Sequence, residues 1–257
     1  MSAAALSLVN VTKRFGGLAA VCDVTLEVPD GSLTALIGPN GAGKTTLFNL
    51  VTNLFAPTAG DIYFYGTSLN DLSPGHIAGL GLIRTFQTAR VFPGMTVLEN
   101  VLVGGHRHMR RHAVEQMLWL ASARGEETKL TAKADALLGM TGLSRFRDDA
   151  ATDLPMGAQK LLEVARGLMA RPRLLLLDEP AAGLNDSETG ELASLLRAVR
   201  DSGVTVMVVE HNMSLVMGAA DLVTVLDAGY LVASGSPQEI RRNARVIEAY
   251  VGPEAAV

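Results

Sequence analysis

Apolar runs alternate with amphipathic segments over much of the chain, and this alternation predicts an α/β fold. The nearly continuous apolar runs at 33–37, 174–177 and 204–209 are typical of parallel strands that are buried on both faces. Between them lie stretches whose apolar positions recur at helical spacing. We therefore expect a parallel sheet with helices packed against it, the helices spanning 156–170, 187–203 and 211–220, with another between Lys44 and Leu54.

Two parts of the chain depart from this alternation. Residues 6–36 contain β-rich segments, including 6–15 and 24–28, separated by turn residues, and 61–66 follows as another short strand. From about Thr88 to Asp153 the pattern becomes helical, with most of the leucine and alanine at 97–105, 113–123 and 133–143, which predicts an inserted helical subdomain. We expect a single domain, 1–257, in which a helical subdomain at 88–170 interrupts a core built from 1–87 and 171–257.

Composition and charge exclude several classes of protein. Hydrophobic residues make up 48% of the chain and charged residues 19%, as in a globular protein rather than a disordered one. The net charge of -4 gives no general attraction to nucleic acid, so no nucleic-acid partner is expected. The single cysteine, Cys22, excludes an intramolecular disulfide, and we interpret it as a small buried hydrophobe in a protein of the reducing cytoplasm.

Insertion into a membrane is not expected either. The first residues lack the basic start and apolar core of a signal peptide. The most apolar long stretch, 203–223, is interrupted by Glu210, His211 and Asp221, which are rare in membrane spans. Any role at a membrane must therefore come through a partner.

A glycine-rich motif between a predicted strand and a predicted helix indicates a phosphate-binding loop. It fits the pattern G-x-x-x-x-G-K-[ST] and its context. The glycines let the backbone wrap around phosphate oxygens, and the amides at the helix N-terminus point partial positive charge at them. Lys44 can reach the β and γ phosphates, and Thr45 can ligate Mg²⁺. The candidate nucleotide-binding residues are Gly38, Pro39, Asn40, Gly41, Ala42, Gly43, Lys44, Thr45 and Thr46.

Two consecutive carboxylates, Asp178 and Glu179, follow the apolar run at 174–177. Parallel α/β sheets place their ligands at the carboxyl ends of such strands. We expect Asp178 to hold Mg²⁺ through water and Glu179 to act as general base on the attacking water. A carboxylate pair that caps the next helix is the structural alternative.

Together with Gln87 in RTFQ, the AGLN turn at 182–185 and His211 after VTVMVVE, these motifs resemble the nucleotide-binding subunit of an ABC transporter over nearly the whole chain. The resemblance implies the P-loop NTPase (RecA-like) fold, with a parallel core sheet, an antiparallel β subdomain and an inserted α-helical subdomain. It also implies that ATP and Mg²⁺ are bound.

The resemblance further implies roles for three residues. Phe15 would stack on adenine, Gln87 would sense Mg²⁺ and the attacking water, and His211 would contact the γ phosphate. The catalytic set is then Glu179, His211 and Gln87, and the metal set is Thr45, Gln87 and Asp178. Each of the three has a structural alternative: aromatic packing for Phe15, an ordinary loop amide for Gln87 and a structural histidine for His211.

The chain departs from the family at the signature motif, usually Leu-Ser-Gly-Gly-Gln, which grips the γ phosphate of ATP on the opposite subunit. Here the residues are Leu154, Pro155, Met156, Gly157 and Ala158. Proline offers neither an N–H nor a hydroxyl, although it suits the first turn of a helix. We expect phosphate binding to depend on Gly157, neighbouring amides and the helix dipole, and hydrolysis to be slowed.

Four segments, at 84–104, 177–185, 210–217 and 246–252, resemble the larger ATP-binding subunit of branched-chain amino-acid importers. This implies a homodimer or heterodimer with a second ABC ATPase subunit, docked on two integral-membrane permeases at the cytoplasmic face of the membrane. An extracytoplasmic solute-binding protein would act indirectly. Three alternatives stay open: an importer ATPase for amides, urea or aromatic acids, a non-transport ABC ATPase, and a weakly hydrolysing regulatory subunit.

Overall fold

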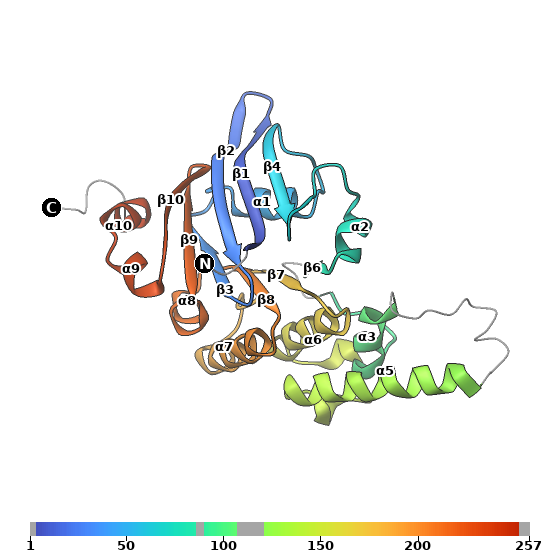
Figure 1. Cartoon of the computed structure of the whole chain (residues 1–257). Helices are drawn as coiled ribbons and strands as arrows, with labels where there is room; N and C mark the ends of the chain where they lie inside the picture. The colour runs from blue at the N-terminus through green and yellow to red at the C-terminus, as the bar shows by residue number, and fades with distance from the viewer. Residues whose placement is uncertain (1–3, 86–89, 107–120, 252–257) are drawn as a thin grey trace. The chain divides into compact units, whose positions relative to one another are not determined.

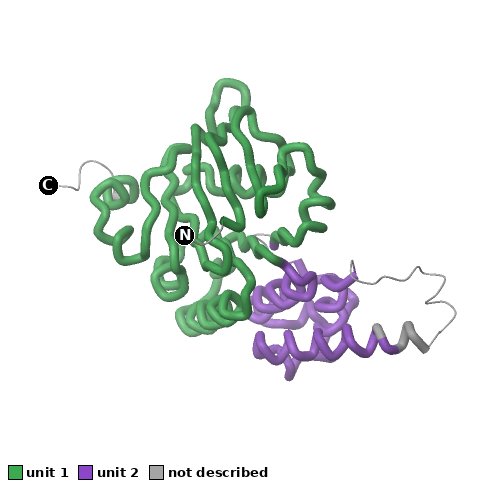
Figure 2. Tube along the Cα trace, viewed as in Figure 1, with its two compact units in different colours: residues 1–84, 173–257 green, residues 85–172 purple. Residues whose placement is uncertain are grey.

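The computed structural model describes residues 4–85, 90–106 and 121–251 (Figure 1). The chain divides into two compact units, one formed by 1–84 and 173–257 and the other by 85–172 (Figure 2). Each unit is described by itself below.

A six-stranded sheet forms the centre of the first unit, with the strand order β10-β9-β3-β8-β7-β6. All neighbouring strands run parallel except β9 and β10, which pair antiparallel. Every residue of β3, β7 and β8 is buried, which explains the nearly continuous apolar runs in the sequence. The strands are β3 Leu33–Ile37, β6 Leu82–Arg84, β7 Leu174–Asp178, β8 Thr205–Val209, β9 Leu222–Asp227 and β10 Tyr230–Gly235.

A second sheet in the same unit is antiparallel, with the order β2-β1-β4-β5. Its strands are β1 Ala4–Phe15, β2 Leu18–Pro29, β4 Ala59–Phe64 and β5 Thr67–Ser68. The predicted α/β fold class, with a parallel core and an antiparallel β subdomain, is thereby confirmed.

The helices of the first unit are α1 Lys44–Val51, α2 Pro74–Gly79, α7 Asp186–Asp201, α8 Met213–Ala219, α9 Pro237–Arg241 and α10 Ala244–Val251. Helices α7 and α8 lie side by side next to the parallel sheet (Figure 1). Helix α7 begins with a capping box, in which Asn185 and Glu188 bond each other's backbone N–H groups. Asn212 caps α8 in the simpler way, by accepting from the backbone N–H of Leu215.

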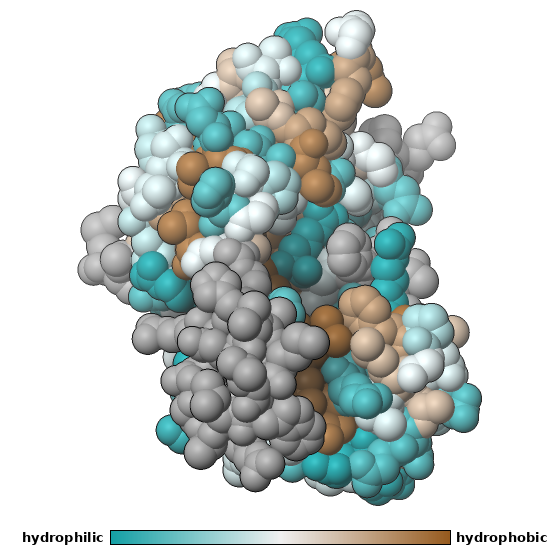
Figure 3. Space-filling model, turned by 90° about the vertical axis from the view of Figure 1, so that its right-hand side faces the viewer, coloured by the Kyte–Doolittle hydropathy of each residue, from teal (hydrophilic) through white to brown (hydrophobic). Residues whose placement is uncertain are grey.

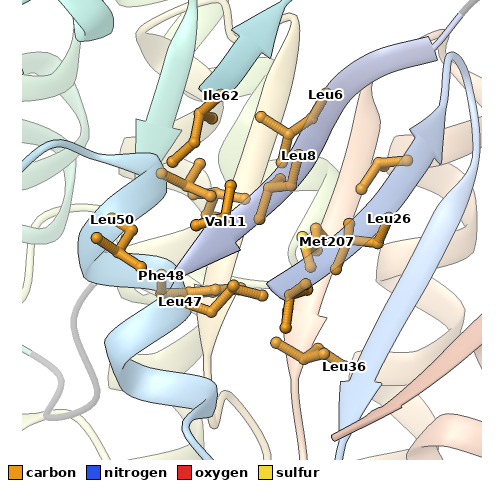
Figure 4. Packing of buried hydrophobic residues seen from close by; sticks show 14 of the residues in the cluster. Leu6, Leu8, Val11, Leu26, Leu36, Leu47, Phe48, Leu50, Ile62 and Met207 are labelled. Carbon is orange, nitrogen blue, oxygen red and sulfur yellow. The ribbon is translucent and has the colours of Figure 1, made fainter. Parts of the chain in front are cut away.

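One hydrophobic core joins α1 to both sheets (Figure 4). Leu47 and Phe48 of α1 face Leu36 of β3 and Met207 of β8, and apolar side chains of the antiparallel sheet also belong to the cluster. Strands β7 and β8 contribute only alternate residues, because successive side chains of a strand point to opposite faces. This packing holds α1 firmly against the ends of the central strands, where the candidate site lies.

The described residues of the second unit form helices α3 Val97–Gly104, α5 Ala121–Met140 and α6 Met156–Met169, with short 3-10 turns at Ser144–Phe146 and Ala151–Asp153. Val97, Leu138 and Leu162 belong to its core. Helices α3 and α6 approach so closely that a Cβ at Gly104 would lie 2.1 Å from the carbonyl oxygen of Arg166. The helical pattern predicted at 113–123 falls largely outside the described residues.

Hydrophilic and hydrophobic patches are interspersed over the coloured part of the face shown in Figure 3. Over the ranges that the structure describes, no helix combines the length and hydropathy that crossing a membrane requires. Cys22 is partly exposed, so the interpretation of this residue as a buried hydrophobe is wrong. It lies in β2, where the backbone pairs with Gly229 and leaves the side chain at the edge of the core.

Candidate nucleotide-binding site

The loop between β3 and α1 has a backbone that only glycine fits at two positions. Gly38 has a φ of 150° and Gly43 a φ of 99°. A Cβ at Gly38 would lie 2.0 Å from the carbonyl oxygen of Leu226, and one at Gly43 would lie 2.4 Å from that of Ala20. Gly43 is also the N-cap of α1, so the amides of the first helical turn point out of the loop toward any bound anion.

Lys44 is buried at the start of α1, and its side chain folds back over the loop. Its Nζ donates to the carbonyl oxygens of Gly38, at 2.7 Å, and Pro39, at 3.0 Å. Burial lowers the pKa of Lys44, while the carboxylates of Glu179 and Asp178 oppose this shift. The ammonium group is thus hydrogen-bonded to two backbone carbonyls. Phosphate oxygens are stronger acceptors and would replace these carbonyls as its partners.

The carboxyl ends of three neighbouring strands lie level with one another. Val209 of β8 pairs with Leu36 of β3 on one side and with Asp178 of β7 on the other. The phosphate loop follows β3, Glu179 follows β7 and His211 follows β8. The register of the sheet therefore places the three segments that the sequence motifs indicate at the same edge, where the carboxyl ends of the strands lie.

Glu179 and His211 meet at this edge. Glu179 has a φ of 48°, uncommon for a residue with a side chain, and its N–H donates to the carbonyl oxygen of Val209 at 2.9 Å. His211 Nδ1 lies 3.9 Å from Glu179 Oε1, and the histidine side chain is 60% exposed. An exposed histidine beside a carboxylate is available to a ligand, unlike a histidine whose hydrogen bonds are satisfied within a core.

Asp178 is almost fully buried, with 4% of its side chain exposed, and it pairs with Arg84. Arg84 Nη2 lies 2.7 Å from Asp178 Oδ2, and Nη1 donates to Asn49 Oδ1 at 2.6 Å. No motif in the sequence points to Arg84. A buried aspartate requires a counter-charge, but the partner lies 94 residues away along the chain, so only the parallel pairing of β6 with β7 identifies it.

Glu210 is fully buried and joins two loops of the site. Its carboxylate accepts from the N–H of Ala181 at 2.7 Å, and from those of His211 and Asn212 at 3.1 Å each. Burial raises the pKa of Glu210, and these backbone bonds oppose the shift. In the sequence Glu210 stands out only as an interruption of an apolar stretch, although a charged residue directly after a buried strand is a signal of such a role.

Phe15 presents an exposed aromatic ring at the end of β1, with 47% of the residue accessible. Its ring meets that of Phe55 edge-on, with centroids 5.3 Å apart. Lys13 Nζ lies 5.2 Å from the first centroid and 4.8 Å from the second. The ring is thus supported from one side while remaining open to a flat ligand.

The remaining candidates are Gln87 and Gly157 of the signature motif. Gln87 falls outside the described residues. Pro155 and Gly157 belong to the second unit, where Pro155 is the N-cap of α6, with a φ of -54° and a ψ of 152°, and Gly157 is buried in the first turn. The side chain of Gln159 donates to the carbonyl oxygen of Leu154 at 2.9 Å, which fixes the approach to this helix.

Comparison with known proteins gives consistent results. The family described as ABC transporter matches residues 21–182, and the family described as Branched-chain amino acid ATP-binding cassette transporter matches 231–254. The chain is 43% identical to the high-affinity branched-chain amino acid transport ATP-binding protein BraF of Pseudomonas aeruginosa, over 98% of this chain and 99% of that protein.

Solved structures agree with these sequence matches. The ADP conformation of an ATP-binding cassette of an ABC transporter superposes with a TM-score of 0.84 at 30% identity, covering 97% of this chain and 99% of the other. A dimeric ATP-binding cassette bound to ADP and Pi superposes with a TM-score of 0.75 at 26% identity, covering 90% and 98%. With its sequence matched over more than half its length and its fold over nearly all of it, the chain belongs to the ABC transporter family, as an ATP-binding protein that hydrolyses ATP.

Proposed function

We propose that this chain powers the import of branched-chain amino acids. The observation that carries the proposal is the match of 231–254 to the branched-chain amino acid cassette family, together with the nearly full-length identity to BraF. An ATPase site of this kind would by itself suit any ABC transporter. The C-terminal match is what favours this class of solute over amides, urea or aromatic acids.

The residues at the sheet edge take the following roles in the proposal. The loop from Gly38 to Thr46 wraps the phosphates, and Lys44 exchanges its two carbonyl partners for the β and γ phosphates. Glu179 takes a proton from the attacking water, and His211 bonds the γ phosphate from the exposed side. Phe15 stacks on adenine, and Gln87 contacts the ion and the attacking water.

The donors at this edge fit a magnesium nucleotide. Mg²⁺ prefers oxygen ligands and is held by one or two carboxylates together with substrate phosphates, so no cage of protein ligands is needed. Over the described ranges no group of three or more His, Cys, Asp or Glu residues that could hold a metal ion occurs. Thr45, exposed at the start of α1, and Asp178 supply the hydroxyl and carboxylate oxygens, with Gln87 as a third donor. The ion would neutralise negative charge on the phosphates.

In the assembly we propose, 1–257 is a single ABC nucleotide-binding domain, with 1–87 and 171–257 as the ATP-binding core and 88–170 as the helical subdomain. It pairs with a second ABC ATPase subunit, and Gly157 contacts the nucleotide of that subunit. Two integral-membrane permeases hold the pair at the cytoplasmic face of the membrane, and an extracytoplasmic solute-binding protein delivers the solute. No nucleic acid takes part.

Purification from detergent-solubilised membranes, followed by ATPase assays in proteoliposomes, tests this function. We expect two permeases to copurify, and leucine, isoleucine or valine with the binding protein to stimulate ATP hydrolysis. Stimulation by amides or urea, and none by these amino acids, would contradict the choice of solute. Copurification with ribosomes or DNA would contradict transport itself.

A further inference from the structure

Arg84 makes contacts to which the roles above assign no purpose. It ends β6, and its guanidinium bonds Asp178 at the end of β7 and Asn49 on α1. It also lies over the ring of Phe48, 5.6 Å from the centroid. One side chain therefore joins the helix that follows the phosphate loop to the acidic end of a central strand.

The two elements that Arg84 joins carry both described residues proposed to hold magnesium. Asn49 lies four residues after Thr45, which places the two on the same side of α1. Because Mg²⁺ demands nearly ideal geometry, Thr45 and Asp178 serve one ion only at a defined separation of α1 from β7. We propose that Arg84 is a positioning residue that sets this separation, an inference that rests on the proposed magnesium site.

The chemistry of the contact favours this role over that of a simple ion pair. The side chains of Arg84 and Asp178 are only 14% and 4% exposed, so solvent screens their attraction weakly. A guanidinium is a rigid fork that serves Asp178 and Asn49 at the same time, whereas the ammonium of a lysine is a point donor. Replacing Arg84 by lysine therefore keeps the charge and removes the bridge.

The test measures how much Mg²⁺ the full chain needs to bind nucleotide. Fluorescent N-methylanthraniloyl-ATP is titrated in EDTA and then at rising Mg²⁺ concentration, with wild type, Arg84→Gln, Arg84→Lys and Asn49→Ala. Arg200→Lys is the matched control, because Arg200 also bridges two carboxylates, those of Asp201 and Asp221, away from the strand ends that form the site.

We expect Arg84→Gln to raise the Mg²⁺ concentration for half-maximal binding by about tenfold, and Arg84→Lys and Asn49→Ala by about threefold. Binding in EDTA and the Arg200→Lys control should stay at the wild-type value. Should Arg84→Gln not fold, the other two variants carry the test. An unchanged Mg²⁺ requirement in all folded variants, even with a lowered Tm, overturns the positioning role. A wild type that needs no Mg²⁺ overturns the magnesium site and this inference with it.

Discussion

Replacing Glu210 by glutamine tests how the loops that carry Glu179 and His211 are held together. Glu210 Oε1 accepts from the N–H of Ala181, and Oε2 accepts from those of His211 and Asn212. Glutamine has the same shape but presents an NH₂ group in place of one oxygen. In its better orientation the amide keeps both bonds on the side of His211 and leaves only the N–H of Ala181 without an acceptor.

A buried donor without a partner costs about 1–3 kcal/mol. Removing a buried charge returns part of its desolvation cost, since burial raises the pKa of Glu210. We therefore expect Glu210→Gln to lower the free energy of unfolding by about 1–2 kcal/mol. The rate of ATP hydrolysis should fall as well, because the segment that begins at Ala181 is released from the loop that carries His211.

Urea unfolding followed by circular dichroism, with ATPase assays at saturating ATP, measures both effects. Glu188→Gln is the matched control, since Glu188 also accepts a backbone N–H, that of Asn185, but at the exposed start of α7. Loss of such an exposed cap costs about 0.5–1 kcal/mol and should leave turnover unchanged. A Glu210→Gln protein with the stability and turnover of the control would refute the reasoning.

Three further predictions concern other parts of the chain. Glu179→Gln should nearly eliminate ATP turnover while calorimetry finds ATP binding intact, and normal hydrolysis would show that the base is misassigned. Pro155→Ser should raise ATPase activity by up to about tenfold, because a hydroxyl adds one bond to a charged phosphate, and unchanged or lower turnover would argue against this. The hydroxyl of Tyr65 donates to Asp30 and lowers the pKa of this carboxyl group below 3.8, its value in the unfolded chain. The ionised carboxylate therefore stabilises the fold at pH values above 3.8, and this stabilisation is lost as the pH falls through the lower pKa of the folded protein. Urea unfolding at neutral and acidic pH should show less acid sensitivity in Asp30→Asn than in the wild type, and equal sensitivity would contradict the assignment.

The sequence predicts best what depends on nearest neighbours along the chain. The buried runs of β3, β7 and β8 are visible because strands covered on both faces are apolar throughout. The phosphate loop is visible because its backbone requires glycine at fixed spacing. The apolar spacing and the proline, which are local signals, predict a helix at 156–170, and α6 spans Met156–Met169.

Short elements escaped prediction because their stability comes from pairing and caps. Strand β6 has three residues and exists through its pairing with β7. Helices α2 and α9, of six and five residues, each depend on a serine N-cap and a proline in the first turn. The sequence pattern predicts a strand only at 24–28, but β2 begins at Leu18, because irregular pairing with β1 breaks the alternation that marks a strand.

The candidate site shows the same limit. Lys44, Asp178 and Glu179 follow from motifs whose chemistry is local. Arg84 and Glu210 act on partners 94 and 29 residues away, and only the folded sheet brings those groups together. No spacing rule along the chain would have paired them.

The central claim is that the loop ending in Lys44 and the carboxylates after Leu177 surround one metal–nucleotide complex. Anomalous diffraction from crystals of the full-length Glu179→Gln protein, grown with ATP and Mn²⁺ in place of Mg²⁺, tests it most directly. We predict a single manganese peak within coordination distance of the Thr45 hydroxyl, at about 2 Å, and one water away from Asp178. Nucleotide density elsewhere, or a peak remote from these residues, would contradict the claim.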